Sequence, residues 1–358
     1  MIYIGTDDGI YRWFAGGNWP TFHSLQGRAV VDLASPGGGV LVAVDAGGTI
    51  LETTDNGQEW REVSSPLGAG RPSSLALDGS PVELILATRP FGLYRRPIGP
   101  NPAPSGLAVA DEQVGILIRR AIGLARGGQG GTAVKEPPPA PPARNPWRTL
   151  ANPDVGPAHA APYIRSLEAS SGVWFAAVAG AGLWRSTDLG TTWQRCEGLP
   201  AEVYAIRTAP KPAGTVAVAT SDGCWISSDG GQAWEDKSGG LKARHLRAVE
   251  IKPGNANYLL AGAAPVGPGE GPVAPRGGLQ FALYESKDGG KTWSHVQRGF
   301  PEVLEYDTIT DIHFDPVDPD YAVVALGSGE LWSTRSDGLW WEPLARQTRS
   351  ARVLCAVG

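Results

Sequence analysis

The sequence predicts an all-β fold, a seven-bladed β-propeller built from four-stranded antiparallel blades. Three observations support this prediction: an octet that recurs along the chain, a spacing near 40 residues between its copies, and four short strand-like segments in each interval. Four short strands in about 40 residues are the signature of one propeller blade. The 358 residues are enough for seven such units, so we expect residues 1–358 to form a single domain.

The octet follows the pattern Ser/Thr-x-Asp-x-Gly-x-x-Trp. SKDGGKTW (286–293), TTDNGQEW (53–60), STDLGTTW (186–193) and SSDGGQAW (227–234) are complete copies. Their aspartates are Asp55, Asp188, Asp229 and Asp288. Two degenerate copies, RWFAGGNW (12–19) and TRSDGLWW (334–341), keep the Gly and the Trp but have no Asp at the third position.

The spacing of the copies gives the number of blades. Asp188 and Asp229 are 41 residues apart, as are Asp55 and position 14 of the first degenerate copy. Asp55 and Asp188 are 133 residues apart, which leaves room for one further unit with a large insertion. Seven units result.

Each part of the octet has a structural role in a hairpin turn between third and fourth strands. The Asp can accept hydrogen bonds from nearby backbone N–H groups, and the Gly supplies a backbone angle that other residues resist. The hydroxyl can close the turn, and the Trp places a large apolar face between sheets. A calcium loop needs several carboxylates at alternate positions, whereas each octet offers one, so we expect no metal and no cofactor.

The two chain ends predict how the ring closes. IYIGT, near the N-terminus, reads as the second strand of its blade, and SARVLCAVG, at the C-terminus, reads as a first strand. We therefore expect residues 351–357 to complete blade one beside residues 2–5, which would remove the free sheet edges.

The largest insertion, residues 97–145, replaces the octet of blade three. Apolar residues recur in it at helical spacing, which predicts a short amphipathic helix at about 112–126, followed by a Pro-rich extended segment. The helix either docks on its own propeller or is an arm that binds a partner or a membrane surface. The residues expected to make that contact are Leu117, Ile118, Arg119, Arg120 and Ile122.

A second insertion, residues 263–278, joins the second and third strands of blade six. Loops of this kind share one face of a propeller with the links between blades, and this is the face where propeller ligands usually bind. We interpret the segment as a flexible loop at the rim of that face.

The links between blades should bring basic residues together on this ligand face. The candidates are Arg28, Arg165, Arg244, His245, Arg247 and Arg352, with Glu305 and Tyr306 from one further link. A basic ligand face in a protein of net charge −5 could attract an anion, a sugar acid or an acidic protein segment. Ordinary ion pairs between blades are the alternative interpretation.

The octet resembles the Asp-box, also called the BNR repeat, and the chain is similar to Asp-box propellers over nearly its whole length except residues 97–145. This group includes sialidases, xyloglucanases, sortilin-type receptors and photosystem II assembly factors. IHFDPVDPDYAVVAL (312–326) resembles the link between first and second strands in the same group. The resemblance implies the propeller fold, but the group mixes enzymes with binding proteins.

The enzymes of the group match the chain only in part. TDDGIYRW (6–13) is similar to a xyloglucanase segment whose Asp is the catalytic base, which would make Asp7 the candidate base. The segment is one residue shorter here, and TSDGCW (220–225) shows that related strings arise from blade repetition. Xyloglucanases also use a second propeller for the acid. Sialidases need a FRIP-like motif, and only YIRS (163–166) is present.

These observations favour a non-catalytic binding or assembly scaffold, with a glycoside hydrolase of xyloglucanase-like or sialidase-like type as the alternative. We expect a protein partner or complex, or else an anionic or carbohydrate ligand. The acidic balance argues against nucleic acid. No apolar run approaches about 20 residues and no signal peptide is seen, so we expect no transmembrane segment and a cytoplasmic location. The three separated cysteines, Cys196, Cys224 and Cys355, are expected to be buried free thiols.

Overall fold

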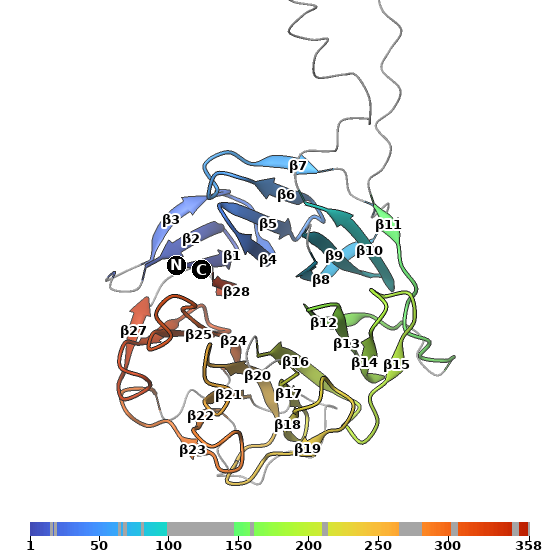
Figure 1. Cartoon of the computed structure of the whole chain (residues 1–358). Helices are drawn as coiled ribbons and strands as arrows, with labels where there is room; N and C mark the ends of the chain where they lie inside the picture. Colours follow the sequence, from blue (N-terminus) through green and yellow to red (C-terminus); the bar gives the residue numbers. More distant parts are fainter. Residues whose placement is uncertain are drawn as a thin grey trace, which may run out of the picture.

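The described strands of the computed structural model form seven antiparallel sheets of four strands each, arranged as the blades of a ring (Figure 1). The predicted all-β, seven-bladed propeller is therefore confirmed. The structure describes residues 1–14, 17, 20–63, 66, 70–79, 82–98, 147–157, 161–209, 214–264, 281–301, 307–345 and 351–356.

The first three blades contain the N-terminal strands and one strand from the C-terminus. Blade one comprises β28 (Ala351–Ala356), β1 (Ile2–Thr6), β2 (Gly9–Trp13) and β3 (Thr21–Ser24). Blade two comprises β4 (Val30–Gly37), β5 (Val40–Asp45), β6 (Ile50–Thr53) and β7 (Arg61–Val63). Blade three comprises β8 (Arg71–Asp78), β9 (Glu83–Arg89), β10 (Gly92–Pro97) and β11 (Arg148–Thr149).

The other four blades follow in chain order. Blade four comprises β12 (Ile164–Ser170), β13 (Val173–Val178), β14 (Gly182–Ser186) and β15 (Gln194–Arg195). Blade five comprises β16 (Val203–Thr208), β17 (Val216–Thr220), β18 (Gly223–Ser227) and β19 (Glu235–Asp236). Blade six comprises β20 (Leu246–Ile251), β21 (Leu259–Ala263), β22 (Ala282–Ser286) and β23 (Ser294–His295). Blade seven comprises β24 (Ile309–Phe314), β25 (Ala322–Leu326), β26 (Leu331–Thr334) and β27 (Trp341–Ala345).

The hydrophobic core lies between blades. The second strands, such as β17 and β25, are buried along their whole length, because a neighbouring blade covers each of their two faces. One core cluster joins Phe175 and Leu183 of blade four to Val203, Ile206 and Val216 of blade five. Each blade therefore needs its neighbours to bury its apolar residues.

The antiparallel order of strands assigns every turn to one of two faces. The links between blades and the turns from second to third strand lie on one face, which we call the upper face. The turns from first to second strand and from third to fourth strand, including the octets, lie on the opposite, lower face. Asp7, Arg28, Arg165, Arg244, His245 and Arg247 thus belong to the upper face or to the strand ends next to it.

The innermost strand of every blade carries a β-bulge near its upper end. The register with the second strand shifts by one residue there, so one extra residue is unpaired in each first strand. The extra residues, in blade order from one to seven, are Arg352, Val31, Ser73, Arg165, Tyr204, Arg247 and Thr310. Bulges re-aim side chains, and here they repeat around the axis of the ring.

Two inserted segments were predicted from the sequence, and most of their residues lie outside the described part of the chain. β10 and β11 pair as neighbours in blade three, with Arg95 opposite Arg148. The predicted helix at 112–126, the Pro-rich segment and the loop after Ala264 stay predictions. Within the described residues, no helix is long and apolar enough to cross a membrane.

Blade three keeps one residue of the octet that sequence comparison missed. In blade four Trp193 stands immediately before Gln194, which pairs with Arg185. Trp147 stands immediately before Arg148, which pairs with Arg95, so Trp147 occupies the Trp position of the octet. Arg96 occupies the Ser/Thr position, and its guanidinium lies 5.5 Å from the centre of the Trp147 ring.

Candidate functional site

Two arginines and a tyrosine meet at the upper end of three neighbouring innermost strands. Arg165, Tyr204 and Arg247 are the bulge residues of β12, β16 and β20. The Arg165 guanidinium carbon lies 4.5 Å from the centre of the Tyr204 ring, and that of Arg247 lies 4.1 Å from it. The arginines of blades four and six therefore stack on one aromatic ring from the blade between them.

Further residues extend this stack, which we call the Arg–Tyr cluster. The Arg89 guanidinium lies 3.2 Å from the ring centre of Tyr163, a ring that Arg165 also approaches at 6.0 Å. His245 packs against Tyr204 at 5.1 Å between ring centres. The Arg–Tyr cluster is thus Arg89, Tyr163, Arg165, Tyr204, His245 and Arg247.

Burial, stacking and an ion pair hold the side chains of the Arg–Tyr cluster in place. Tyr204 is only 6% exposed, while Arg165 and Arg247 are half-buried. An Nη1 atom of Arg165 donates to Glu202 at 2.8 Å, which orients that side chain further. Three guanidiniums held beside aromatic rings can bind a carboxylate or phosphate at little ordering cost.

The structure brings together three of the predicted ligand-face residues and places two others in separate pairs. Arg165, His245 and Arg247 meet at Tyr204. Arg28 donates to Asp45 at 2.8 Å. Arg244 donates to Asp222 at 2.5 Å and to Asp236 at 3.1 Å, so the ion-pair interpretation holds for Arg28 and Arg244. Arg165 also forms an ion pair, with Glu202, in addition to its place in the cluster.

Several predicted residues fall outside the described part of the chain and stay predictions. Glu305 and Tyr306 belong to the undescribed stretch 302–306. The backbone of Arg352 lies in β28, but its side chain is outside the description. The five residues of the blade-three insertion, Leu117 to Ile122, also lie outside it.

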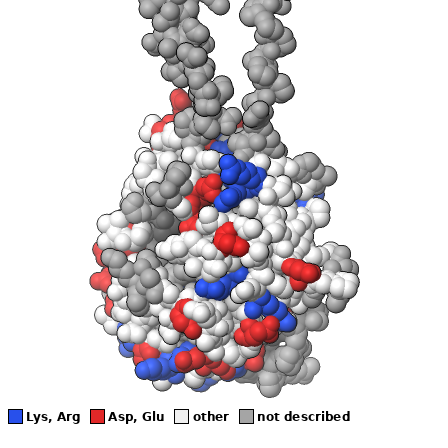
Figure 2. Space-filling model, turned by 45° about the vertical axis from the view of Figure 1, so that its right-hand side comes forward, with Lys and Arg blue, Asp and Glu red and all other residues white. Residues whose placement is uncertain are grey.

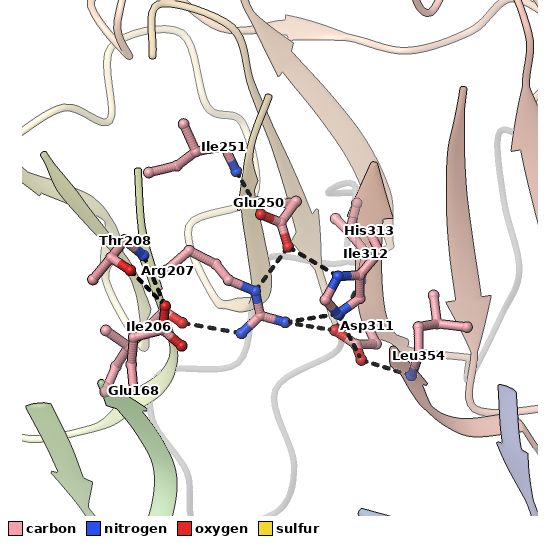
Figure 3. A network of polar contacts seen from close by, with 10 residues as sticks. All are labelled: Glu168, Ile206, Arg207, Thr208, Glu250, Ile251, Asp311, Ile312, His313 and Leu354. Carbon is pink, nitrogen blue, oxygen red and sulfur yellow. Dashed lines mark hydrogen bonds and ion pairs between the residues drawn. The ribbon is translucent and has the colours of Figure 1, made fainter. Parts of the chain in front are cut away.

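Beneath the Arg–Tyr cluster lies a second polar layer that the sequence analysis missed. Its members, which we call the Arg207 layer, are Glu168, Arg207, Glu250, Asp311 and His313, and they converge from four innermost strands (Figure 3). Arg207 donates from Nε to Glu250 at 2.8 Å and from Nη2 to Asp311 at 2.9 Å. Thr208 donates to Glu168 through both its hydroxyl and its backbone N–H.

The charges of the Arg207 layer compensate one another. Burial disfavours the charged imidazolium of His313, but the attraction of Asp311 and Glu250 outweighs this and raises the His313 pKa. Burial likewise opposes ionisation of Asp311, yet His313 and Arg207 hold the Asp311 pKa below its usual range. For Glu168 burial dominates and raises the pKa. A cationic centre held by three carboxylates results.

A simple signal in the sequence could have revealed this layer. When the blades are aligned on their bulges, Glu168, Arg207, Glu250 and His313 occupy the same position, three residues after the bulge residue. The equivalent positions in blades two and three are Ala34 and Ala76. Four polar, ionisable residues at a position that is Ala in two other blades indicate a specific polar network inside the ring.

Asp7 lies in a turn whose hydrogen bonds recur in another blade. In blade one the Thr6 hydroxyl donates to the Gly9 carbonyl and accepts from the N–H of Asp8. In blade five Thr220 makes the same pair of bonds, to Gly223 and from Asp222. The similarity of TDDG to TSDG therefore has a structural cause, which weakens the case for Asp7 as a catalytic base.

The octet aspartates hold their own turns on the lower face. Asp188 accepts from the Thr192 hydroxyl and from the N–H groups of Thr191 and Thr192, and its Oδ1 also accepts from the Ser186 hydroxyl. Asp55, Asp229 and Asp288 accept the corresponding backbone bonds. The hydrogen bonds from Thr192 lower the Asp188 pKa to about 2, and those from Thr292 do the same for Asp288.

The described residues offer little else that could be a reactive or metal site. Among them, no group of three or more His, Cys, Asp or Glu side chains is placed to hold a metal ion. Cys196 and Cys224 are buried free thiols, and burial raises their pKa values to about 11 and about 12. The side of the molecule in Figure 2 shows basic and acidic residues interspersed, without one large field of a single sign.

Comparison with known proteins gives matches at the level of structure. No protein family and no curated protein matches the chain. YCF48 bound to a D1 peptide matches with a TM-score of 0.52 and 16% identity, over 88% of this chain and 82% of that one. YCF48 from Cyanidioschyzon merolae matches with a TM-score of 0.54 and 14% identity, over 91% of this chain and 87% of that one.

A glycoside hydrolase is also similar in fold. The GH74 enzyme of Niastella koreensis matches with a TM-score of 0.59 and 16% identity over 95% of this chain, which spans 51% of that enzyme. At these identities the likeness shows the fold alone. The chain is a seven-bladed β-propeller structurally similar to YCF48 and to the GH74 enzyme of Niastella koreensis, and the octets predicted this fold.

Proposed function

We propose that the protein is a non-catalytic binding or assembly scaffold that recognises an acidic segment of a partner protein at the Arg–Tyr cluster. The observation that carries the proposal is the stacking of Arg165 and Arg247 on Tyr204. A structural neighbour, YCF48, is described with a bound peptide, which supports a peptide ligand for this fold. A cation that is already ordered by stacking loses little rotamer freedom when it pairs with a carboxylate.

The test uses a fluorescein-labelled hexaglutamate peptide and fluorescence anisotropy at low salt. We expect binding that weakens as salt is added, and a Kd raised about tenfold or more in Arg165→Gln and in Arg247→Gln. Arg244→Gln is the matched control, because Arg244 belongs to the upper face and forms ion pairs, as Arg165 does, but is not a member of the Arg–Tyr cluster. Equal Kd values in the three variants, or no binding by the parent, would reject the proposal.

The insertion of blade three is proposed as a second contact with the partner. Its predicted apolar stripe, with Leu117, Ile118 and Ile122, would pack on a partner, while Arg119 and Arg120 would pair with acidic groups. Deletion of residues 100–144 should abolish co-purification of partners from the native host and leave the ring folded. An unchanged set of partners would remove the insertion from the proposal.

The alternative, a glycoside hydrolase, is separated from this proposal by activity. Two carboxylates must flank the glycosidic bond, about 5–10 Å apart. We expect the parent and an Asp7→Asn variant to be equally inert on a panel of β-glucans, xyloglucan and sialosides. Hydrolysis by the parent that Asp7→Asn abolishes would establish the enzyme instead.

A further inference from the structure

We infer that Arg207 is a positioning residue for the Arg–Tyr cluster, setting the relative placement of the three strands that carry Arg165, Tyr204 and Arg247. It does so from the Arg207 layer, without contact to the ligand. The inference rests on the proposed function for its biological meaning, but its structural content can be tested without any ligand.

The two layers are built on the same three strands. β12 carries Arg165 and Glu168, β16 carries Tyr204 and Arg207, and β20 carries Arg247 and Glu250. In each strand the lower residue follows the bulge residue at the same spacing. Any sliding or rotation of one strand against its neighbour therefore moves both layers together.

Arg207 and Glu168 fasten these strands across blade boundaries. Arg207 ties β16 to β20 through Glu250 and to β24 through Asp311, at 2.8 and 2.9 Å. Glu168 ties β12 to β16, since it accepts the Thr208 hydroxyl at 2.7 Å and the Thr208 N–H at 3.2 Å. Asp311 in turn accepts the N–H of Leu354 in β28 at 3.0 Å, which extends the connection to blade one.

Removal of the Arg207 charge would leave several carboxylates facing one another. Glu168, Glu250 and Asp311 surround the guanidinium, and His313 lies 3.6 Å from both Glu250 and Asp311 (Figure 3). Unpaired carboxylates in such a site separate, take up protons or admit water. Because Glu250 and Arg247 belong to one short strand, displacement of Glu250 would loosen the stacking of Arg247 on Tyr204.

The first test observes the cluster directly, without a ligand. The side-chain Nε–Hε NMR signals of Arg165 and Arg247, assigned with Arg165→Lys and Arg247→Lys, should shift or broaden in Arg207→Gln. They should stay close to the parent in Arg96→Gln, which removes the Arg96–Glu52 ion pair between blades two and three. Unchanged signals in Arg207→Gln, or equal changes in Arg96→Gln, would overturn the inference.

The second test measures function with the hexaglutamate peptide, at a temperature below the unfolding midpoint of every variant. We expect the Kd to rise about tenfold in Arg207→Gln and less in Arg207→Lys, which keeps the charge but cannot donate to Glu250 and Asp311 as a planar fork. Arg96→Gln should keep the parent Kd. If Arg207→Gln does not fold, Arg207→Lys provides the same comparison, and a parent-like Kd together with parent-like NMR signals in it counts against the inference.

A double-mutant cycle shows whether Arg207 acts through the stack. In a Tyr204→Leu background the stack is absent, so Arg207→Gln should change the Kd less than about twofold. If Arg207→Gln raised the Kd by the same factor in that background as in the parent, Arg207 would act by its own charge, and the positioning role would be rejected. If the parent binds no hexaglutamate, the proposed function fails, while the NMR comparison still decides the inference.

Discussion

Asp188 illustrates how a single side chain can specify a turn. Its carboxylate accepts bonds from donors no more than four residues away, and the Ser186 hydroxyl accepts the Gly190 N–H at 2.9 Å. Gly190 has a φ of +78°, and a Cβ at this position would lie 2.7 Å from the Trp174 ring. The hydrogen bonds join residues within the octet, so they can be read from eight letters, whereas the contact with Trp174 depends on the neighbouring strand.

We expect Asp188→Ala to lower the thermal midpoint by roughly a few degrees, because the turn loses the four hydrogen bonds that this carboxylate accepts. The depressed pKa sets the pH dependence of this contribution. The contribution is present above the ordinary Asp pKa of 3.8 and is lost as the pH falls through about 2. Differential scanning calorimetry of the variant and of Asp318→Ala, an exposed Asp on the same face, would check this. A midpoint as low in Asp318→Ala would contradict the specific role of Asp188.

The pKa of Asp32 is raised, whereas the pKa of Asp188 is lowered. Its Oδ2 accepts the Leu75 N–H of the next blade at 2.7 Å, and its Oδ1 accepts the Leu33 N–H at 2.8 Å. Burial outweighs these bonds and raises the Asp32 pKa to about 7. Between pH 3.8 and about 7, Asp32 therefore keeps its proton in the folded state, whereas it has lost that proton in most unfolded chains.

The sign of the resulting pH dependence follows directly. The Asp32 contribution to stability is complete below pH 3.8 and is lost as the pH rises through about 7. From about pH 5 to pH 8, the free energy of unfolding of the parent should fall relative to Asp32→Asn by on the order of 1 kcal/mol, since Asp32 is only half-buried. Urea unfolding of both proteins at several pH values measures this difference. A difference in the free energy of unfolding that does not change with pH would contradict the prediction.

At the scale of the element, blade three shows that the hairpin between third and fourth strands forms without a complete octet. β10 and β11 pair in the usual register although the chain between them is long. Trp147 keeps the octet Trp position, and Arg96 keeps the first position while it pairs with Glu52 of blade two. The hairpin therefore depends on its flanking strands and on packing between blades, not on a short turn.

This leads to a graft experiment. A chain in which KDGGKT replaces residues 97–146, between Arg96 and Trp147, restores the length of the other octets. We expect it to fold with a thermal midpoint at or above that of the parent, because the shorter loop reduces the closure entropy. Circular dichroism and calorimetry check this, and loss of cooperative unfolding would show that the replaced residues contribute to the ring.

At the scale of the whole molecule, the first and last strands of the chain share a blade. β28 pairs with β1, with Ile4 opposite Leu354, and also contacts the innermost strands on either side of it (Figure 1). Leu354 is 2% exposed and belongs to a core cluster with Ile2, Ile4 and Val323. The strands β1 and β28 are therefore packed into the core between blades one and seven.

We expect deletion of residues 351–358 to prevent cooperative folding, because it removes the innermost strand of blade one and exposes its neighbours. The milder Leu354→Ala should cost about 2–5 kcal/mol in urea unfolding, as for other buried Leu residues. A matched change on an exposed side chain, Leu339→Ala, should stay within about 0.5 kcal/mol. A truncated chain with the parent midpoint would show that β28 is dispensable.

Much of the fold and part of the candidate site could be predicted from the sequence. The octets gave the number of blades, and strand order placed Arg165, His245 and Arg247 toward the upper face. Tyr204, Tyr163 and Arg89 were not predicted as partners, and neither was the Arg207 layer. Arg28 and Arg244 were grouped with the cluster, whereas the structure pairs each with aspartates.

The sequence by itself determined what depends on near neighbours in the chain: the octet turns, the strand pattern and the order of blades. The side-chain hydrogen bonds of the octet turns join residues within four positions, so the chemistry of these turns is visible in eight letters. Only the tertiary structure decided which side chains face the axis and meet there. Arg165 and Arg247 reach one tyrosine, and Arg207 reaches Asp311 more than 100 residues away, because a bulge in every first strand and the curvature of the ring bring distant strands together. Such contacts depend on the relative placement of whole blades, which no local pattern encodes.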